Sequence, residues 1–128
     1  MVIKGKLMDG ADMENTFRRL AFEVLESEGG AENLALVGIR TRGVPTARRV
    51  AEEIYKIEGK RVPLGEFDIT LYRDDLETLP DEARVLDSVI DFDVTDKNVL
   101  LCDDVIYTGR TVRAAISALL ELGRPRSI

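Results

Sequence analysis

The chain has 128 residues, of which 45% are hydrophobic, and its formal net charge is −6. This length and composition are ordinary for one globular α/β domain. A single cysteine excludes an internal disulfide, and the lack of histidine excludes a histidine-dependent zinc site or catalytic triad. No stretch approaches the roughly 20 apolar residues of a membrane span. Because residues 1–6 also contain no signal-peptide core, we expect a cytoplasmic protein.

The first predicted element is a helix over residues 12–28. Its apolar residues recur with helical spacing, and Gly29 follows as a stop signal. Thr16, Arg18 and Arg19 fall on the other side of this helix. A solvated face is the simplest interpretation of these three residues.

The second element is a short apolar run at residues 34–39, which predicts the first central strand. A loop with two arginines and a glycine follows, made of Arg40, Thr41, Arg42 and Gly43. At the carboxyl end of a strand, such a loop can offer positive charge and backbone N–H groups to an anion. Composition alone also allows a plain solvated turn. Residues 45–58 then show the proline start and the apolar spacing of a crossover helix.

Strand character resumes at residues 62–69, and a long acidic segment follows. Residues 70–97 have many acids and weak periodicity, which predicts a flexible loop or hairpin. The acidity is local, because residues 66–104 contain 13 acids and 3 bases, whereas residues 40–61 contain 7 bases and 3 acids. The net charge of −6 therefore does not exclude a polyanionic partner on another face.

The most informative stretch begins with an apolar run typical of a central parallel strand, expected at residues 98–104. Asp103 and Asp104 lie at its carboxyl end, where open α/β sheets bind ligands. Gly109 opens a helix predicted over residues 109–122, whose free N–H groups and dipole favour an anion. Ionised carboxylates accept hydrogen bonds and therefore suit vicinal hydroxyls. A phosphate site beside a diol site indicates a ribose 5-phosphate ligand.

This stretch resembles the phosphoribosyl pyrophosphate (PRPP) motif of the type I phosphoribosyltransferases. Its residues are Val99, Leu100, Leu101, Cys102, Asp103, Asp104, Val105, Ile106, Tyr107, Thr108, Gly109, Arg110 and Thr111. Residues 36–43, 65–76 and 123–128 extend the resemblance over nearly the whole chain. They are most similar to the branch of the family in which a uracil phosphoribosyltransferase also regulates pyrimidine operons by transcription attenuation.

The resemblance implies an α/β, three-layer phosphoribosyltransferase fold with a mainly parallel central sheet and a flexible loop. It also implies Mg²⁺-dependent transfer of the phosphoribosyl group from PRPP to uracil, which gives UMP and pyrophosphate. Asp103, Asp104 and Arg73 are the catalytic residues that it implies, and residues 40–43 form the pyrophosphate loop. The Mg²⁺ ion is expected to arrive with PRPP or pyrophosphate, with no residue binding the metal directly.

The resemblance further implies UMP or UTP as effectors, pyrimidine operon leader mRNA as a partner, and a homo-oligomer, either dimer or tetramer. Thr16, Arg18 and Arg19 are the residues expected to contact RNA. Phe22 stands where a polar residue is expected, which puts the RNA contact in doubt. Two alternatives stay open: an RNA-binding regulator with little catalysis, or a phosphoribosyltransferase that uses a purine base. Residues 70–76 disfavour the purine alternative.

The last residues predict a helix end at Gly123 and the start of another strand at Ser127 and Ile128. Members of the resembled family continue with further strands that supply the nucleobase pocket. We therefore expect residues 1–128 to form a single domain that is incomplete at its C-terminus. Either another chain completes the open sheet edge or the chain is truncated, and the sequence leaves both possibilities open.

Overall fold

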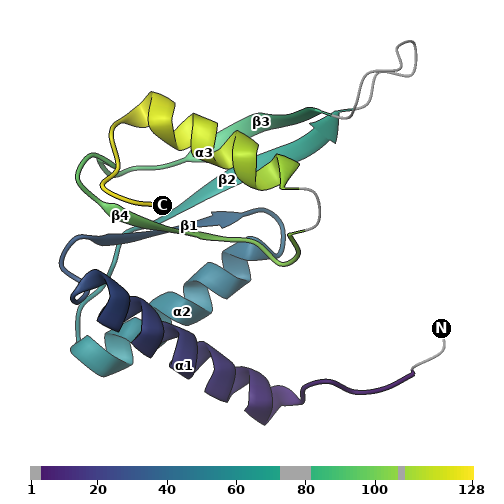
Figure 1. Ribbon diagram of the computed structural model, residues 1–128, viewed down its shortest axis with the longest axis vertical. Helices are drawn as coiled ribbons and strands as arrows, with labels where there is room; N and C mark the ends of the chain where they lie inside the picture. Colours follow the sequence, from purple (N-terminus) through teal and green to yellow (C-terminus); the bar gives the residue numbers. More distant parts are fainter. Residues whose placement is uncertain (1–3, 73–81, 107–108) are drawn as a thin grey trace.

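The computed structural model describes residues 4–72, 82–106 and 109–128, which form three helices and one four-stranded sheet (Figure 1). In chain order the elements are α1 (Gly10–Glu28), β1 (Leu34–Ile39), α2 (Gly43–Glu58), β2 (Leu64–Tyr72), β3 (Glu82–Val89), β4 (Asn98–Cys102) and α3 (Arg110–Leu122). The strand order is β3-β2-β1-β4. β1 is parallel to β2 and β4, whereas β3 is antiparallel to β2.

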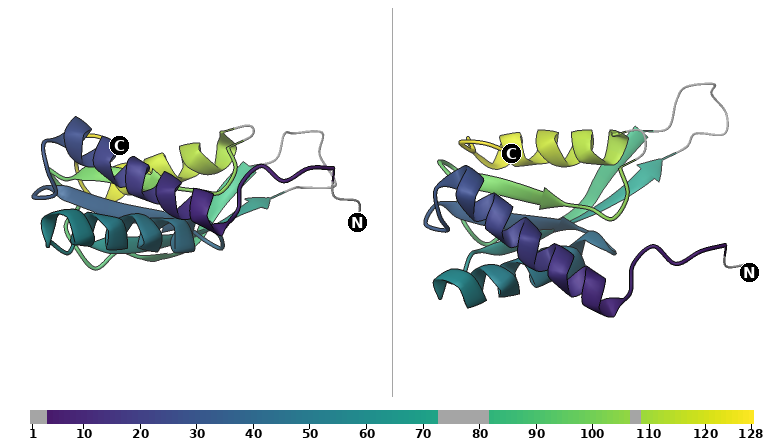
Figure 2. Two further views of the ribbon diagram at one scale, coloured as in Figure 1. Left: turned by 90° about the horizontal axis from the view of Figure 1, so that it is seen from below. Right: turned by 60° about the horizontal axis from the view of Figure 1, so that its bottom comes forward.

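The helices cover both faces of the sheet, so the protein has three layers (Figure 2). α1 and α2 pack on one face, where Leu34 and Leu36 of β1 meet residues such as Ile54 of α2. α3 packs on the other face against residues such as Phe67 and Val37. The fold class predicted from the sequence, a three-layer domain with a mainly parallel sheet, is confirmed.

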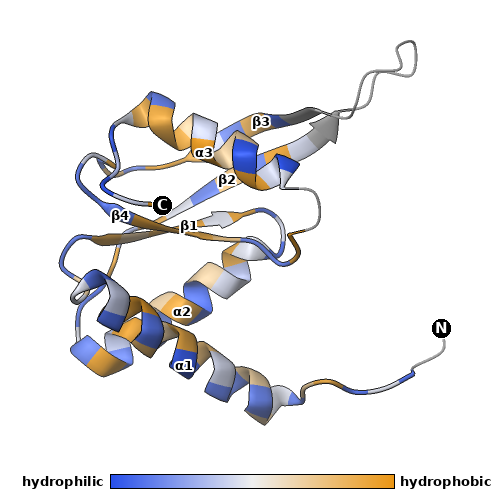
Figure 3. Cartoon of the chain, in the orientation of Figure 1, coloured by the Kyte–Doolittle hydropathy of each residue, from blue (hydrophilic) through white to orange (hydrophobic). Residues whose placement is uncertain are grey.

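The central strand β1 is apolar because both of its faces are covered. All six of its residues are buried, and Figure 3 shows β1 and β4 as mostly apolar stretches between helices that are polar on their outer sides. A parallel strand in the middle of a sheet has no solvated face, which removes the usual alternation of polar and apolar residues.

Local signals fix the ends of α1. The side chain of Asp9 accepts a hydrogen bond from the Asp12 backbone N–H at 2.8 Å, and the Asp12 side chain accepts one from the Asp9 backbone. This reciprocal pair satisfies two N–H groups that the helix itself leaves free. Gly29 ends the helix with a left-handed φ of 72°, which glycine adopts without steric cost.

A close backbone approach joins the turn after β1 to the end of β4. A Cβ atom on Gly43 would collide with the carbonyl oxygen of Cys102. A Cβ atom on Gly38 would lie only 2.6 Å from Cα of Val44. Only glycine fits at these two positions, and the first turn of α2 can therefore lie directly against the β1 and β4 strand ends.

The segment predicted as a flexible loop, residues 70–97, contains regular structure at both ends. β2 extends to Tyr72, and β3 runs back beside it from Glu82 to Val89 with a register irregularity at Asp68/Ile69. This part is the hairpin that the sequence analysis gave as one of two options. Residues 73–81 lie outside the described residues, and the flexibility of the segment stays a prediction.

The predicted strand start at the end of the chain pairs with the outer edge of β4. Ser127 forms a parallel bridge with Asn98, and its carbonyl accepts a hydrogen bond from the Val99 N–H at 2.9 Å. The Ser127 hydroxyl also donates to the Asn98 side chain at 2.9 Å.

In the part of the chain that the structure describes, no helix has the length and apolar character needed to cross a bilayer.

Candidate functional site

The two loops singled out by sequence meet at one edge of the sheet. β1 and β4 are parallel neighbours, with Gly38 paired to Cys102, so both strands end at the same level. Residues 40–42 therefore emerge beside Asp103 and Asp104. Adjacent carboxyl ends of parallel strands are where open α/β sheets bind ligands.

The apolar half of the PRPP-like motif belongs to the core. Residues Val99 to Cys102 lie in β4, with Val99 and Cys102 buried and Leu100 and Leu101 packed against the two hydrophobic clusters. Burial raises the pKa of the Cys102 thiol to about 11. A neutral, buried thiol is a packing group.

The two aspartates follow β4 directly, and they differ in environment. Asp103 is half-buried and Asp104 is exposed. Burial raises the pKa of Asp103, an effect that the Asp104 charge reinforces and the Asp104 backbone N–H opposes by donating to Asp103 Oδ1 at 2.8 Å. A carboxylate with a raised pKa lacks enough donors or positive charge around it, so it is prepared to accept hydrogen bonds from a ligand.

The turn after the aspartates opens toward solvent. The side chains of Val105 and Ile106 are 69% and 73% exposed. Tyr107 and Thr108 of the motif lie outside the described residues. The chain re-enters regular structure at Gly109, the N-cap of α3.

Gly109 gives the N-terminus of α3 the properties of an anion site. Its φ is 80°, and as a glycine it offers no side chain of its own to cap the helix. The first turn of a helix leaves its backbone N–H groups without a partner inside the helix. No atom of residues 4–72, 82–106 or 111–128 lies within 4 Å of the place where a Cβ on Gly109 would be, so these residues leave the backbone open to a ligand.

The guanidinium of Arg40 is held by three carboxylates of β2 and β3. Its Nε donates to Glu66 Oε1 at 3.1 Å, and its Nη1 lies 4.0 Å from Asp68 Oδ2 and 3.6 Å from Asp87 Oδ2. The hydrogen bond that Arg40 donates to Glu66 is the largest cause of the raised pKa of Arg40. The guanidinium therefore ties the end of β1 to the β2–β3 hairpin. Sequence reasoning missed this role, although acids at alternate positions of β2 were a visible signal for a shared face.

The rest of the expected pyrophosphate loop is available to a ligand. Thr41 and Arg42 are exposed, and Arg42 makes no ion pair with the described residues. The carbonyl of Arg42 accepts a hydrogen bond from the Thr46 hydroxyl at 3.3 Å, which fixes the start of α2. Of the two arginines in this loop, Arg42 is therefore the one without an ion pair to the part of the chain that the structure describes.

The residues expected to contact RNA lie on α1, away from this edge. The Thr16 hydroxyl donates to the Asp12 carbonyl at 2.8 Å. Arg18 Nε lies 3.8 Å from Glu53 Oε2 of α2, and Arg19 Nε lies 3.8 Å from Glu23 Oε1. Both arginines remain more than half exposed, so their charges are accessible from solvent. Arg73, the third expected catalytic residue, lies outside the described residues.

Comparisons with known proteins define the class. A model of the phosphoribosyl transferase domain family matches residues 5–128. The chain therefore belongs to the phosphoribosyl transferase domain family. It is 52% identical over 128 residues to the Bifunctional protein PyrR of Clostridioides difficile, covering 100% of this chain and 72% of that relative. The Bifunctional protein PyrR of Thermus thermophilus is also 52% identical, with 100% and 71% of the two chains covered.

Solved structures show the same fold at low sequence identity. A hypoxanthine phosphoribosyltransferase from Staphylococcus aureus has a TM-score of 0.77 at 18% identity, over 98% of this chain and 64% of that one. The hypoxanthine-guanine phosphoribosyltransferase of L. donovani also has a TM-score of 0.77 at 18% identity, over 96% and 71%. The chain thus spans about two thirds of the length of these structures. The family and the branch expected from the motifs are confirmed.

The ion pairs of Arg40 generate the first prediction. Arg40→Gln removes the cation that three carboxylates share, so the backbone amides of β2 and β3 should exchange hydrogen several-fold faster. The denaturant midpoint should also fall, and by more at low salt, because the remaining carboxylates then repel one another with less screening. Arg42→Gln is the matched control and should leave both measurements unchanged. Equal protection of the hairpin in the two variants would contradict the role of Arg40.

Proposed function

We propose that this chain carries the PRPP site of a PyrR-type protein, which transfers the phosphoribosyl group from PRPP to uracil. One observation carries the proposal: the half-buried Asp103, the exposed Asp104 and the glycine-led N-terminus of α3 follow the same strand, beside a second loop whose Arg42 makes no ion pair with the described residues. Membership in the phosphoribosyl transferase domain family supports the PRPP part. The names of the relatives at about 50% identity support the uracil part.

Each loop binds a different part of PRPP. The backbone N–H groups at the start of α3, with Thr108 and Thr111, hold the 5-phosphate, and the binding energy of this group positions the reacting carbon. Asp103 and Asp104 accept hydrogen bonds from the ribose hydroxyls. The Thr41–Gly43 part of the loop after β1, with the Arg42 side chain, binds the pyrophosphate. Arg73 remains a proposed catalytic residue on the grounds of the family motif alone.

The reaction exchanges one bond at the anomeric carbon for another. The bond from C1′ to the pyrophosphate oxygen breaks, and pyrophosphate leaves with the electron pair. A uracil nitrogen forms the new bond and loses its proton, which gives UMP. Asp103 and Asp104 stabilise the positive charge that develops on the ribose ring, while Arg42 and backbone N–H groups stabilise the leaving group.

Mg²⁺ is proposed to accompany the ligand. Mg²⁺ is commonly held by one or two carboxylates together with substrate phosphates. Asp103 and Asp104 supply carboxylates of this kind, and no group of three or more metal-ligating side chains occurs among residues 4–72, 82–106 and 109–128. This donor set fits an ion held mainly by the oxygens of PRPP. When bound, the ion neutralises negative charge on the leaving pyrophosphate.

The phosphate role of Gly109 is tested by Gly109→Val. A branched side chain at φ 80° strains the backbone and blocks close approach to the N–H groups, so PRPP with Mg²⁺ should no longer raise the melting temperature. In the unaltered chain, PRPP at 100 times its Kd should add about 2.7 kcal/mol of stability. Gly59→Val, at φ 68° and the far end of α2, is the matched control and should keep the PRPP shift. An undiminished shift in folded Gly109→Val would remove α3 from the phosphate site.

The carboxylate roles are tested by Asp103→Asn and Asp104→Asn. Each change keeps size but replaces a charged acceptor, and hydrogen bonds to charged groups contribute about 1.5–3 kcal/mol. The Kd for PRPP, measured by calorimetry, should therefore rise about ten- to a hundred-fold. Inorganic phosphate, which binds only the α3 end, should retain its affinity. Asp91→Asn serves as an exposed control, and loss of phosphate binding with normal PRPP binding would contradict the assignment.

RNA binding is the second proposed function, because the relatives at about 50% identity are named bifunctional and α1 exposes two arginines. We propose that Arg18, Arg19 and Thr16 contact pyrimidine operon leader mRNA, with UMP or UTP at the PRPP site as effectors. Self-association as a dimer or tetramer would align several copies of α1 and stays a prediction. Phe22, which is 53% exposed, would offer an aromatic face to an unstacked base in place of a polar contact.

A salt titration tests the RNA proposal. Binding of a leader transcript should weaken steeply with salt, because neutralised phosphates release counterions. Arg19→Gln should reduce the slope of log K against log salt by about 0.7–0.9. Lys60→Gln, which removes one positive charge beyond the end of α2, should leave the slope unchanged. The same slope in all three proteins would exclude α1 from the RNA contact.

A further inference from the structure

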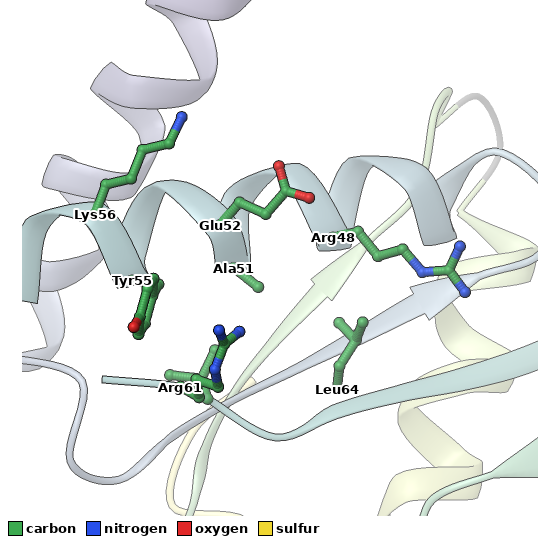
Figure 4. Close-up of a pocket in the computed structure, with 8 residues that line it drawn as sticks. Arg48, Ala51, Glu52, Tyr55, Lys56, Arg61 and Leu64 are labelled. Atoms are coloured by element: carbon green, nitrogen blue, oxygen red, sulfur yellow. The ribbon is translucent and has the colours of Figure 1, made fainter. Parts of the chain in front are cut away.

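A groove lies between α2 and the start of β2, far from the strand ends that form the candidate site. Its volume is about 430 Å³, within the range of small-molecule sites. Arg48, Ala51, Tyr55, Arg61, Val62 and Leu64 line it. Figure 4 shows the side chains of Ala51, Tyr55, Arg61 and Leu64 around one space between the helix and the strand. No step of the proposed phosphoribosyl transfer uses these residues.

The floor of the groove is apolar. Ala51, Val62 and Leu64 are only half-buried, so their outer surfaces line the groove rather than the core. The Tyr55 ring beside them is 42% exposed. A flat organic ring placed here would cover apolar surface that the fold leaves in contact with water.

Arg61 provides a positioned positive charge above this floor. Its guanidinium carbon lies 4.3 Å from the centroid of the Tyr55 ring, a cation–π contact that holds the planar group against the aromatic face. Arg61 takes part in none of the ion pairs found among the described residues. The edges of the guanidinium are therefore free to donate two parallel hydrogen bonds to a carboxylate or phosphate.

The other charged groups at the groove differ from Arg61. Lys56 Nζ lies 3.3 Å from Oε1 of the buried Glu53 carboxylate, and this ion pair neutralises the Lys56 charge. Arg48 Nη2 lies 3.8 Å from Glu66 Oε2, a longer ion pair than that of Lys56. The Arg48 side chain is 60% exposed, so part of its guanidinium stays accessible. Glu52 adds one negative charge at the rim. The arrangement therefore favours an anion of low charge over a polyphosphate.

We propose that this groove binds a small planar organic anion, a ring that carries one carboxylate or one phosphate monoester. The ring covers Leu64, Ala51 and the edge of Tyr55. The anionic group accepts hydrogen bonds from Arg61, and Arg48 supplies a second, weaker attraction. The proposal does not depend on the proposed phosphoribosyl transfer, since the two sites share no residue.

The test is an NMR titration of the full chain with four probes: benzoate, phenyl phosphate, neutral benzyl alcohol and inorganic phosphate. At least one of the two ring anions should give saturable shifts at Tyr55, Arg61, Val62 and Leu64, and the tighter one identifies the head group. Benzyl alcohol and inorganic phosphate should each bind at least five-fold more weakly, because each lacks one half of the recognised chemistry. Absence of saturable shifts at these residues with both ring anions would overturn the proposal.

Variants separate the groove from other anion sites. Arg61→Gln and Tyr55→Leu should each weaken the ring anion at least five-fold, whereas the neighbouring Lys60→Gln should change its Kd by less than two-fold. Shifts that move instead to residues around Gly109 would place the anion at the candidate PRPP site and reject the groove. Concentration-dependent shifts of the groove residues without any probe would also reject it, because a second copy of the chain would then cover the surface.

Discussion

The close backbone approach between the β1–α2 turn and the end of β4 is the constraint on which the candidate site depends. Gly43 lies against the Cys102 carbonyl, and Gly38 lies against the backbone of Val44. These contacts place the backbone of Gly43 directly beside that of Cys102 and Asp103. In the proposed function, a ligand with two anionic ends, such as PRPP, contacts both loops at once.

Much of this arrangement is predictable from sequence, because its signals are local. Continuous apolar runs identify β1 and β4, and Gly109 after an acidic pair marks the start of α3. The end of α1 at Gly29 follows from the same kind of short-range rule, whereas the predicted start at residue 12 misses the Asp9 cap and the true first residue, Gly10. The class of protein was equally accessible, since the motif joins residue types with complementary chemistry at fixed spacing.

The partners of Arg40 were not predictable in this way. The sequence places Arg40 and Arg42 in one cationic loop. In the structure, the Arg40 side chain instead forms ion pairs with Glu66, Asp68 and Asp87. Two of these acids lie on β2 and the third on β3, and the face that they share depends on strand register across a hairpin. Register is a tertiary property, so single-sequence patterns do not determine it. The same limit applies to the groove beside Tyr55, which exists only once α2 has packed over β2.

The parallel pairing of β1 with β4 also has a consequence for kinetics. Leu34 pairs with Asn98, so β1 meets this neighbour only after α2, β2 and β3 have been passed along the chain. Such distant contacts must overcome a large loop-closure entropy before they stabilise anything, and parallel sheets form slowly for this reason. We therefore expect the two loops of the candidate site to come together late in folding. A ligand that contacts both loops would stabilise the pairing of β1 with β4, which we expect to form late. Such a ligand should therefore slow unfolding more than it speeds folding.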